Sequence, residues 1–197
     1  MGDAVIVSTA RTAIGTSRKG TLADLAASDL AVAAIGGLVE RAGIPVDEVD
    51  DLQMGESLQG GGDLARYAAV ELGMLNVPGV ALNRHCASGM AAVQGAAASI
   101  RAGMDRVVIA AGTESISTTP GSMKRILPGD EVGPWMSGSH PETPDAPAFD
   151  MSITVGWNTA QRAEVSREAM DEWAYHSHMR AVRAIDEGRF EEEIVPL

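Results

Sequence analysis

The sequence has 197 residues and a formal net charge of −12 at pH 7, from 27 acidic and 15 basic side chains. This charge disfavours a nucleic-acid partner, because phosphates are bound by Lys and Arg, and the 45% hydrophobic content disfavours disorder. No window approaches the roughly 18 consecutive apolar residues of a membrane-spanning helix, and a single cysteine excludes a disulfide scaffold. The cysteine usage and the lack of a signal or transit pattern lead us to expect a cytoplasmic protein.

Residues 1–117 alternate between predicted strands and predicted helices. Short apolar runs between turn residues indicate strands, and apolar residues at a spacing of three or four indicate helices. In chain order the expected elements are a strand at Ala4–Ser8, a helix carrying Leu25, Val32, Ile35 and Val39 and ending at Gly43, a weak strand at Asp51–Glu56, a helix at Leu64–Leu72, a strand at Gly79–Asn83, a helix at Ser88–Arg101 and a strand at Arg106–Ala111. This order is typical of an α/β fold with a mostly parallel sheet and helices on both faces.

The Ser88–Arg101 helix is rich in alanine and has no charged residue before Arg101. Small apolar residues on every side of a helix favour close packing all round. We therefore predict that this helix is buried between other elements.

Residues 118–197 differ in composition from the first region. Six prolines between Pro120 and Pro147 punctuate a long loop. One helix is predicted after it, with Ser166 as N-cap and Gly188 as its stop. Its expected buried stripe consists of Met170, Trp173, Ala174, Ser177, Ala181, Ala184 and Ile185. We read this region as a partial, α-rich loop domain.

Cys86 is the leading candidate for chemistry, because it stands between a predicted strand and the start of a predicted helix. The positive end of a helix stabilises a thiolate, which is the nucleophilic form of cysteine. Such strand–turn–helix junctions are also where α/β sheets place their sites. Position alone leaves open the alternative of an inert, buried cysteine.

The other polar candidates are weaker. Gly60–Gly62 lacks the spacing of a phosphate-binding loop, and His176 and His178 are two apart on a helix, where they cannot chelate one metal. His85 points away from Cys86 in an extended segment, and His140 lies in the proline-rich loop. Glu114 follows the predicted strand Arg106–Ala111. It is either a site residue or a structural carboxylate that holds the loop after it. No metal site is predicted.

The segment Asn83–Gly89 reads Asn-Arg-His-Cys-Ala-Ser-Gly and resembles the nucleophile motif Asn-x-x-Cys-Ala-Ser-Gly of the thiolases, the acyl-CoA C-acyltransferases that make or cleave 3-ketoacyl-CoA. Val5–Gly15 is similar to the family's first strand and turn, and Ile100–Ser117 to its Gly-x-Glu-Ser-x-Ser segment. Ser166–Leu197 is similar to a stretch that ends in Gly-Arg-Phe and Glu-Ile-Val-Pro. The resemblance covers almost the whole chain and identifies Cys86 as the position of the family nucleophile.

The resemblance implies a fold of two similar α/β halves, with residues 1–117 as the N-terminal domain and 118–197 as part of its loop domain. It implies that Cys86 attacks an acyl-CoA thioester and becomes acylated, with the CoA thioester as substrate and no cofactor. The family's Gly-His-Pro histidine and second catalytic cysteine belong to the other half. We expect that half from a separate chain or from the rest of a longer polypeptide. Family members are dimers or tetramers, so a homo-oligomer is expected.

The resemblance also points to candidate substrate-binding residues in the loop domain. Thr154 stands where the family usually has a histidine that lines the acyl-CoA pocket. CoA phosphates need cationic partners, and Lys124 and Arg125 form the nearest basic pair. We predict that these three residues contact the substrate.

Two hypotheses of different class remain. The first is an enzyme half that is inactive and unstable as a lone monomer and active with a second half. The alternative is a non-catalytic, thiolase-like subunit that binds acyl-CoA or serves assembly. An oxidoreductase is disfavoured, because the turn Ala10–Ser17 contains one glycine and lacks the dinucleotide fingerprint.

Overall fold

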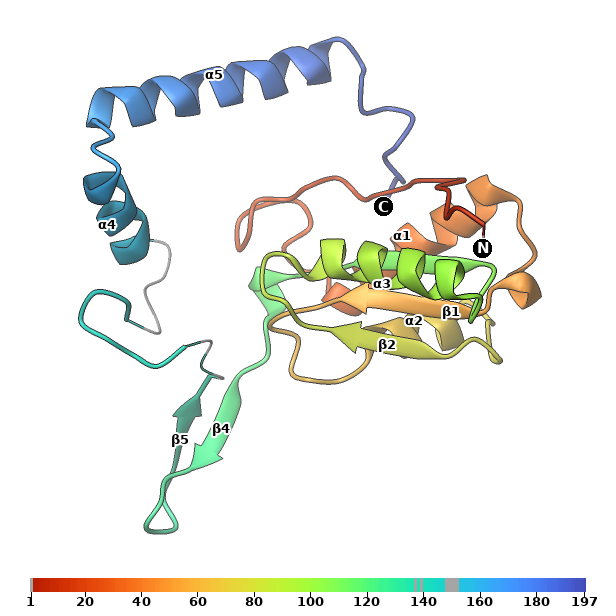
Figure 1. Cartoon of the computed structure of the whole chain (residues 1–197), viewed down its shortest axis with the longest axis horizontal. Helices are drawn as coiled ribbons and strands as arrows, with labels where there is room; N and C mark the ends of the chain where they lie inside the picture. Colours follow the sequence, from red (N-terminus) through yellow and green to blue (C-terminus); the bar gives the residue numbers. More distant parts are fainter. Residues whose placement is uncertain (1, 137, 139, 148–152) are drawn as a thin grey trace. The chain divides into compact units, whose positions relative to one another are not determined.

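The structure is a computed structural model that describes residues 2–136, 138, 140–147 and 153–197. The chain folds into two compact units, the first made of Met1–Gly121 with Glu193–Leu197 and the second of Ser122–Glu192. Figure 1 shows the elements of both units, which are described separately below.

A three-stranded parallel sheet forms the centre of the first unit. β1 (Asp51–Gly55) lies in the middle, with β2 (Gly79–Leu82) on one side and β3 (Val108–Gly112) on the other. In the register, Gly55 pairs with Leu82 and with Gly112, so the three strands end at one edge. The predicted α/β fold with a parallel sheet is confirmed, with strand ends shifted by one or two residues.

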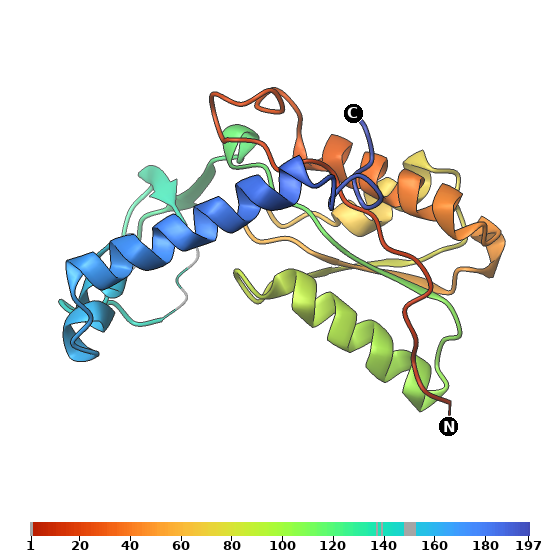
Figure 2. The same cartoon turned by 90° about the horizontal axis from the view of Figure 1, so that it is seen from above.

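Helices cover both faces of this sheet. α1 (Ala27–Ala42) and α2 (Leu64–Glu71) lie on one face and α3 (Ser88–Ala102) on the other (Figure 2). α1 and α3 end at Gly43 and Gly103, whose φ values of 62° and 75° are left-handed, as glycine allows at a helix end. Two short 3₁₀ turns, η1 (Val46–Glu48) and η2 (Ile116–Thr118), connect elements.

The hydrophobic core lies between the sheet and the α1–α2 face. Leu52 and Met54 alternate along β1 toward this side and are fully buried, beside Ile35 of α1 and Ala65 and Ala68 of α2. Gln53, between them, faces α3, since its side chain lies under Gly95. Side chains along β1 thus point alternately to the apolar core under α1 and α2 and to the opposite face under α3.

α3 packs on the sheet by one stripe only. Ser88, Ala92 and Ala96 recur every four residues and are buried, because small side chains let the helix approach the strands closely. Met90 and Val93, on another side of the helix, are exposed. The prediction of burial on all sides is therefore wrong for this chain, in which the sheet covers a single stripe of α3.

The predicted strand at Ala4–Ser8 is not formed. Residues 2–10 carry no strand assignment, and Val5, Ile6 and Val7 are 72%, 78% and 71% exposed. A strand needs a hydrogen-bonded neighbour, and within the described chain β3 pairs with β1 alone. Arg11, which follows this segment, forms a parallel bridge with Ile194 and an ion pair of 2.7 Å with Glu193.

The second unit contains a hairpin and two helices. β4 (Ser122–Arg125) and β5 (Val132–Trp135) pair antiparallel, and α4 (Thr154–Arg162) and α5 (Arg167–Asp186) follow. α5 begins as predicted, with the Ser166 hydroxyl accepting a hydrogen bond from the Ala169 N–H. The hairpin and α4 were not among the expected elements. The polar residues of β4 give no apolar alternation, and α4 is only nine residues long.

The predicted buried stripe of α5 is also wrong for this chain. No residue of α5 is buried, and Trp173 is 76% exposed. The stripe has the helical spacing of an apolar face, but a buried face needs a second element against it. Among the described helices, none is long and apolar enough to cross a membrane.

Candidate active site

Cys86 lies on the turn that joins β2 to α3, at the edge where the parallel strands end. β2 ends at Leu82 and α3 begins at Ser88, so the turn has five residues. The Cys86 side chain is exposed and forms no disulfide. The predicted strand–turn–helix setting of this cysteine is confirmed.

Hydrogen bonds from both ends of the turn fix its shape. The buried Ser88 hydroxyl donates to the His85 carbonyl at 2.6 Å and accepts from the Arg84 N–H at 2.9 Å. The Asn83 carboxamide oxygen accepts from the His85 N–H at 3.0 Å. These bonds hold His85 at φ 50°, a left-handed conformation that costs energy for a residue other than glycine. The turn that presents Cys86 is therefore braced immediately before the cysteine.

A glycine at the end of β1 lets the start of α3 approach the sheet. A Cβ on Gly55, at the end of β1, would stand 2.4 Å from the Ser88 carbonyl carbon and 2.5 Å from the Gly89 nitrogen. A Cβ on Gly112, at the end of β3, would stand at an ordinary contact distance of 3.4 Å from the Gly89 Cα. The glycine at the end of β1 thus allows the N-terminus of α3, with Cys86 just before it, to lie close to the strand ends.

The electrostatic setting of Cys86 favours an anion. α3 has fifteen residues and no acidic residue in its first turn, so its positive end is not neutralised by a carboxylate of its own. The arrangement can present a sulfur nucleophile to an electrophilic carbonyl.

Two carboxylates lie at the same strand edge. Glu56 is 6% exposed, and its carboxylate accepts from the Leu64 N–H at 3.1 Å. Burial raises the pKa of Glu56 above the usual value, an effect increased by Asp63 and Glu114 and opposed by the Leu64 hydrogen bond. Glu114 was expected either to be a site residue or to tie down the loop that follows it. Its carboxylate does hold a loop, but it is the loop after β1, through the N–H groups of Ser57 and Leu58.

Ser57 is a site residue that the sequence reasoning missed. Its hydroxyl donates to the His85 carbonyl at 3.1 Å, and its carbonyl accepts from the Asn83 side chain at 3.1 Å. The available signal was its position directly after β1, because the ends of neighbouring parallel strands meet at one edge.

The other predicted site residues belong to the second unit. Lys124 and Arg125 are neighbours on β4, and the Lys124 ammonium lies 5.6 Å from the centre of the Trp135 ring. Arg125 forms an ion pair of 2.6 Å with Asp130 and donates to the Gly129 carbonyl. Thr154 is the first residue of α4 and is half-buried. Asp130 therefore offsets part of the positive charge that Arg125 would offer to a phosphate.

Two of the remaining histidines, His140 and His176, have local partners in the second unit. The His140 ring nitrogen lies 2.9 Å from the Ala146 carbonyl, and His176 lies 3.7 Å from Glu172 on α5. Among the described residues, no three His, Cys, Asp or Glu side chains are grouped so that they could hold a metal ion.

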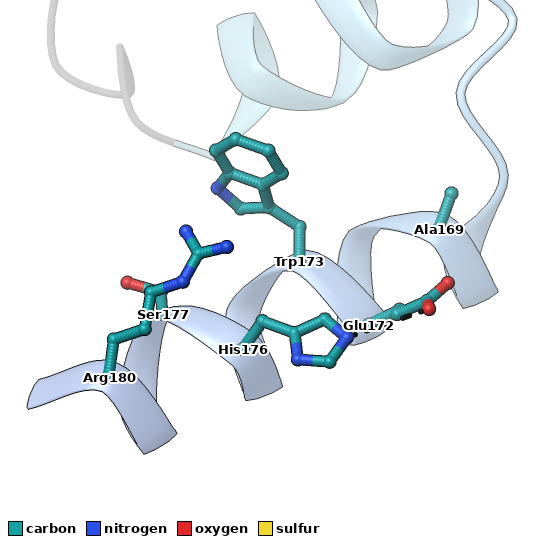
Figure 3. Close-up of a pocket in the computed structure, with 6 residues that line it drawn as sticks. All are labelled: Ala169, Glu172, Trp173, His176, Ser177 and Arg180. Atoms are coloured by element: carbon teal, nitrogen blue, oxygen red, sulfur yellow. Dashed lines mark ion pairs between the residues drawn. The ribbon is translucent and has the colours of Figure 1, made fainter. Parts of the chain in front are cut away.

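Each unit has a surface hollow in its described part. The larger, about 430 Å³, is lined by Ala169, Glu172, Trp173, His176, Ser177 and Arg180 (Figure 3). All six come from α5, so this hollow is an open helix surface. The smaller, about 190 Å³, lies in the first unit between residues 10–12, one side of α1 and the end of β3.

Comparison with known proteins places the whole chain in one group. The family described as "Thiolase, N-terminal domain" matches residues 4–197. The acetyl-CoA acetyltransferase of Cupriavidus necator is 37% identical over 100% of this chain and 51% of its own length. The peroxisomal 3-ketoacyl-CoA thiolase 5 of Arabidopsis thaliana is 38% identical over 99% of this chain and 42% of its own.

A solved structure agrees with these sequence matches. The crystal structure of the Bacillus anthracis acetyl-CoA acetyltransferase has a TM-score of 0.84 and 32% identity, over 100% of this chain and 51% of that one. The chain thus spans about half the length of the relatives it matches.

Proposed function

The chain belongs to the thiolase family, and from this premise we propose that it is the nucleophile-bearing half of an acyl-CoA C-acyltransferase. The observation that carries the proposal is the exposed Cys86 on a braced turn at the N-terminus of α3. The Cys86 sulfur attacks the thioester carbonyl of an acyl-CoA, the carbon–sulfur bond to CoA breaks, and CoA leaves as its thiol. The acyl group is then held as a thioester on Cys86.

The acyl group on Cys86 has two possible acceptors in this reaction class. Transfer to the enolate of a second acyl-CoA forms a 3-ketoacyl-CoA, and transfer to CoA completes the cleavage of one. Both directions need groups that move protons. Cys86 is the one cysteine of this sequence, so we assign the second catalytic cysteine and the proton-accepting histidine to a complementing half.

Surfaces of the first unit support the need for a complementing half. β3 pairs on one side only in the described sheet, and its other edge borders the hollow beside residues 10–12. An unpaired strand edge exposes N–H and C=O groups that take up another strand. Val5–Val7 and Met90 are exposed apolar side chains of the same unit. We propose that the second half covers these surfaces, and that the completed protein forms a dimer or tetramer.

We propose that CoA is bound through the second unit, by Lys124 and Arg125, with Thr154 beside the acyl group. Replacing both basic residues by alanine is expected to weaken CoA binding at low salt, because two phosphate partners are lost. Asp130→Ala is the matched variant of opposite sign: it frees Arg125 from its ion pair and is expected to strengthen binding. Isothermal titration with CoA measures both, and unchanged affinity in the double variant would refute the assignment.

The function itself is tested by the reactivity of Cys86. We expect iodoacetamide to alkylate Cys86 much faster than a free thiol in the assembled protein, and thiolase turnover to require both the second half and Cys86. Ordinary thiol reactivity, with CoA binding that survives Cys86→Ser, would instead favour the non-catalytic subunit. We also propose that the protein works in a compartment reducing enough to keep Cys86 as a free thiol, such as the cytoplasm.

A further inference from the structure

Glu114 holds the loop after β1 by three donors on one carboxylate. One oxygen accepts from the Ser57 N–H at 3.0 Å, and the other accepts from the Leu58 N–H at 3.3 Å and from the Gln59 side-chain amide. The register explains the contact: Gly55 pairs with Gly112, so residues that follow β1 and β3 leave the sheet side by side.

The same loop is connected to both sides of Cys86. Ser57 donates to the His85 carbonyl and accepts from the Asn83 side chain, each at 3.1 Å, and its hydroxyl lies 3.4 Å from that of Ser88. Asn83 and His85 precede the cysteine and Ser88 follows it. Among the described residues, Ser57 therefore links the loop after β1 by hydrogen bonds to the turn that carries Cys86.

The turn depends on such contacts because it contains a strained residue. His85 has φ 50°, and a non-glycine residue stays in this region only where its surroundings fix it. Its N–H is held by Asn83 and its carbonyl by Ser88 and Ser57. The loop beyond Ser57 continues into Gly60 and Gly61, both at positive φ, which do not restrain the backbone. Within the described contacts, the Glu114 carboxylate is the acceptor for both backbone N–H groups at the start of this loop, those of Ser57 and Leu58.

We propose that Glu114 is a positioning residue for Cys86, acting through Ser57 on the His85 conformation. No described contact joins Glu114 to Cys86, so its effect passes through the loop. Replacing the carboxylate leaves one of the backbone donors at Ser57 or Leu58 without an acceptor, releases the loop, and lets Cys86 move from the N-terminus of α3. The inference rests on the proposed function only in taking Cys86 as the nucleophile.

The test is the alkylation of Cys86 by iodoacetamide in the full chain assembled with a thiolase C-terminal half, measured as a rate constant across pH. Mass spectrometry follows the Cys86 peptide, and Cys86→Ser in the same assembly gives the background. Glu114→Gln keeps the size of the side chain and replaces one acceptor oxygen by a donor. We expect its alkylation at neutral pH to fall about three- to tenfold, with a changed pH profile, because Cys86 loses the helix end.

Ser57→Ala gives the second arm of the experiment and keeps the proposal testable if Glu114→Gln folds poorly. It is expected to produce the same change, and the double variant no further change, because both residues act through one contact. Glu40→Gln, an exposed carboxylate on α1, is the matched control and is expected to leave alkylation unchanged.

Two results would overturn the proposal: a wild-type rate and pH profile in folded Glu114→Gln or Ser57→Ala, or additive effects in the double variant. Lower thermal stability with unchanged alkylation would likewise assign Glu114 a structural role only. The comparison is between the alkylation rates of variants and needs no acyl transfer, so it separates this inference from the acyl transfer that the proposed function assigns to Cys86. Failure of Cys86 to accept an acyl group would leave the alkylation result standing.

Discussion

Gly55→Ala tests whether the close approach of α3 to the sheet positions Cys86. The added Cβ would stand 2.4 Å from the Ser88 carbonyl carbon, whereas ordinary contact begins at 3.4 Å. The obstacle is backbone and not a side-chain tip, so the start of α3 must move by about 1 Å. Overpacking of this kind typically costs about 1–3 kcal/mol. For a chain of this size, each kcal/mol lowers the melting temperature by about 2–4 °C.

The assay combines thermal unfolding of the full chain, at fixed protein concentration, with alkylation of Cys86. We expect Gly55→Ala to lower both the melting temperature and the alkylation rate, because α3 carries Ser88 and the turn with it. Gly89→Ala is the matched control: it adds the same methyl group within α3 and meets nothing within 4 Å. Wild-type stability and alkylation in Gly55→Ala would refute the argument that this contact places the cysteine.

Two further predictions concern pH dependence and helix capping. The folded state raises the pKa of Glu56, so it binds more protons than the unfolded state, and wild-type stability declines as pH rises from about 4.3 through the folded value. Glu56→Gln, which can still accept from Leu64, is expected to be more stable than wild type at neutral pH. Urea unfolding across pH checks this, and a gain that persists under acid conditions would contradict it. Ser166→Ala removes the N-cap of α5 and is expected to cost about 0.5–2 kcal/mol; far-UV circular dichroism during urea unfolding measures it. Ser177→Ala, in the exposed middle of α5, is the control, and equal losses in both variants would refute the capping argument.

Local signals predicted the elements whose formation depends on nearby residues. Gly43 and Gly103 end helices because each adopts a left-handed conformation at a helix end. Leu52 and Met54 alternate along a strand whose two neighbours are both in the chain. The strand–turn–helix order around Cys86 followed from the same kind of signal.

Predictions that needed an absent neighbour were wrong. Ala4–Ser8 has the composition of a buried strand, but no described strand pairs with it. The apolar stripe of α5 and the outer side of α3 have the right spacing for burial and remain exposed. The spacing of apolar residues along the sequence predicts which residues share a face of a helix or strand. It does not predict whether another element packs against that face.

The contacts around Cys86 were only partly predictable. Its place before a helix could be read from residues 83–89. The hydrogen bonds that link Glu114 to Ser57 and Ser57 to His85, however, depend on the register that pairs Gly55 with Gly112. That register joins residues more than fifty positions apart and is not encoded in either segment alone. The pairing of Arg125 with Asp130 is set by a hairpin that was not predicted.

The most direct test of the central claim is the trapping of an acyl group on Cys86. The full chain, co-expressed with a thiolase C-terminal half and shown by co-elution to be assembled with it, is incubated with acetyl-CoA, quenched in acid and digested. Mass spectrometry then locates any acetyl group. We predict one acetyl group on the Cys86 peptide of the assembled protein, removed by added CoA and absent from Cys86→Ser. An assembled complex that turns over acetyl-CoA while Cys86 stays unmodified, or that is acetylated equally in Cys86→Ser, would contradict the assignment of Cys86 as the nucleophile.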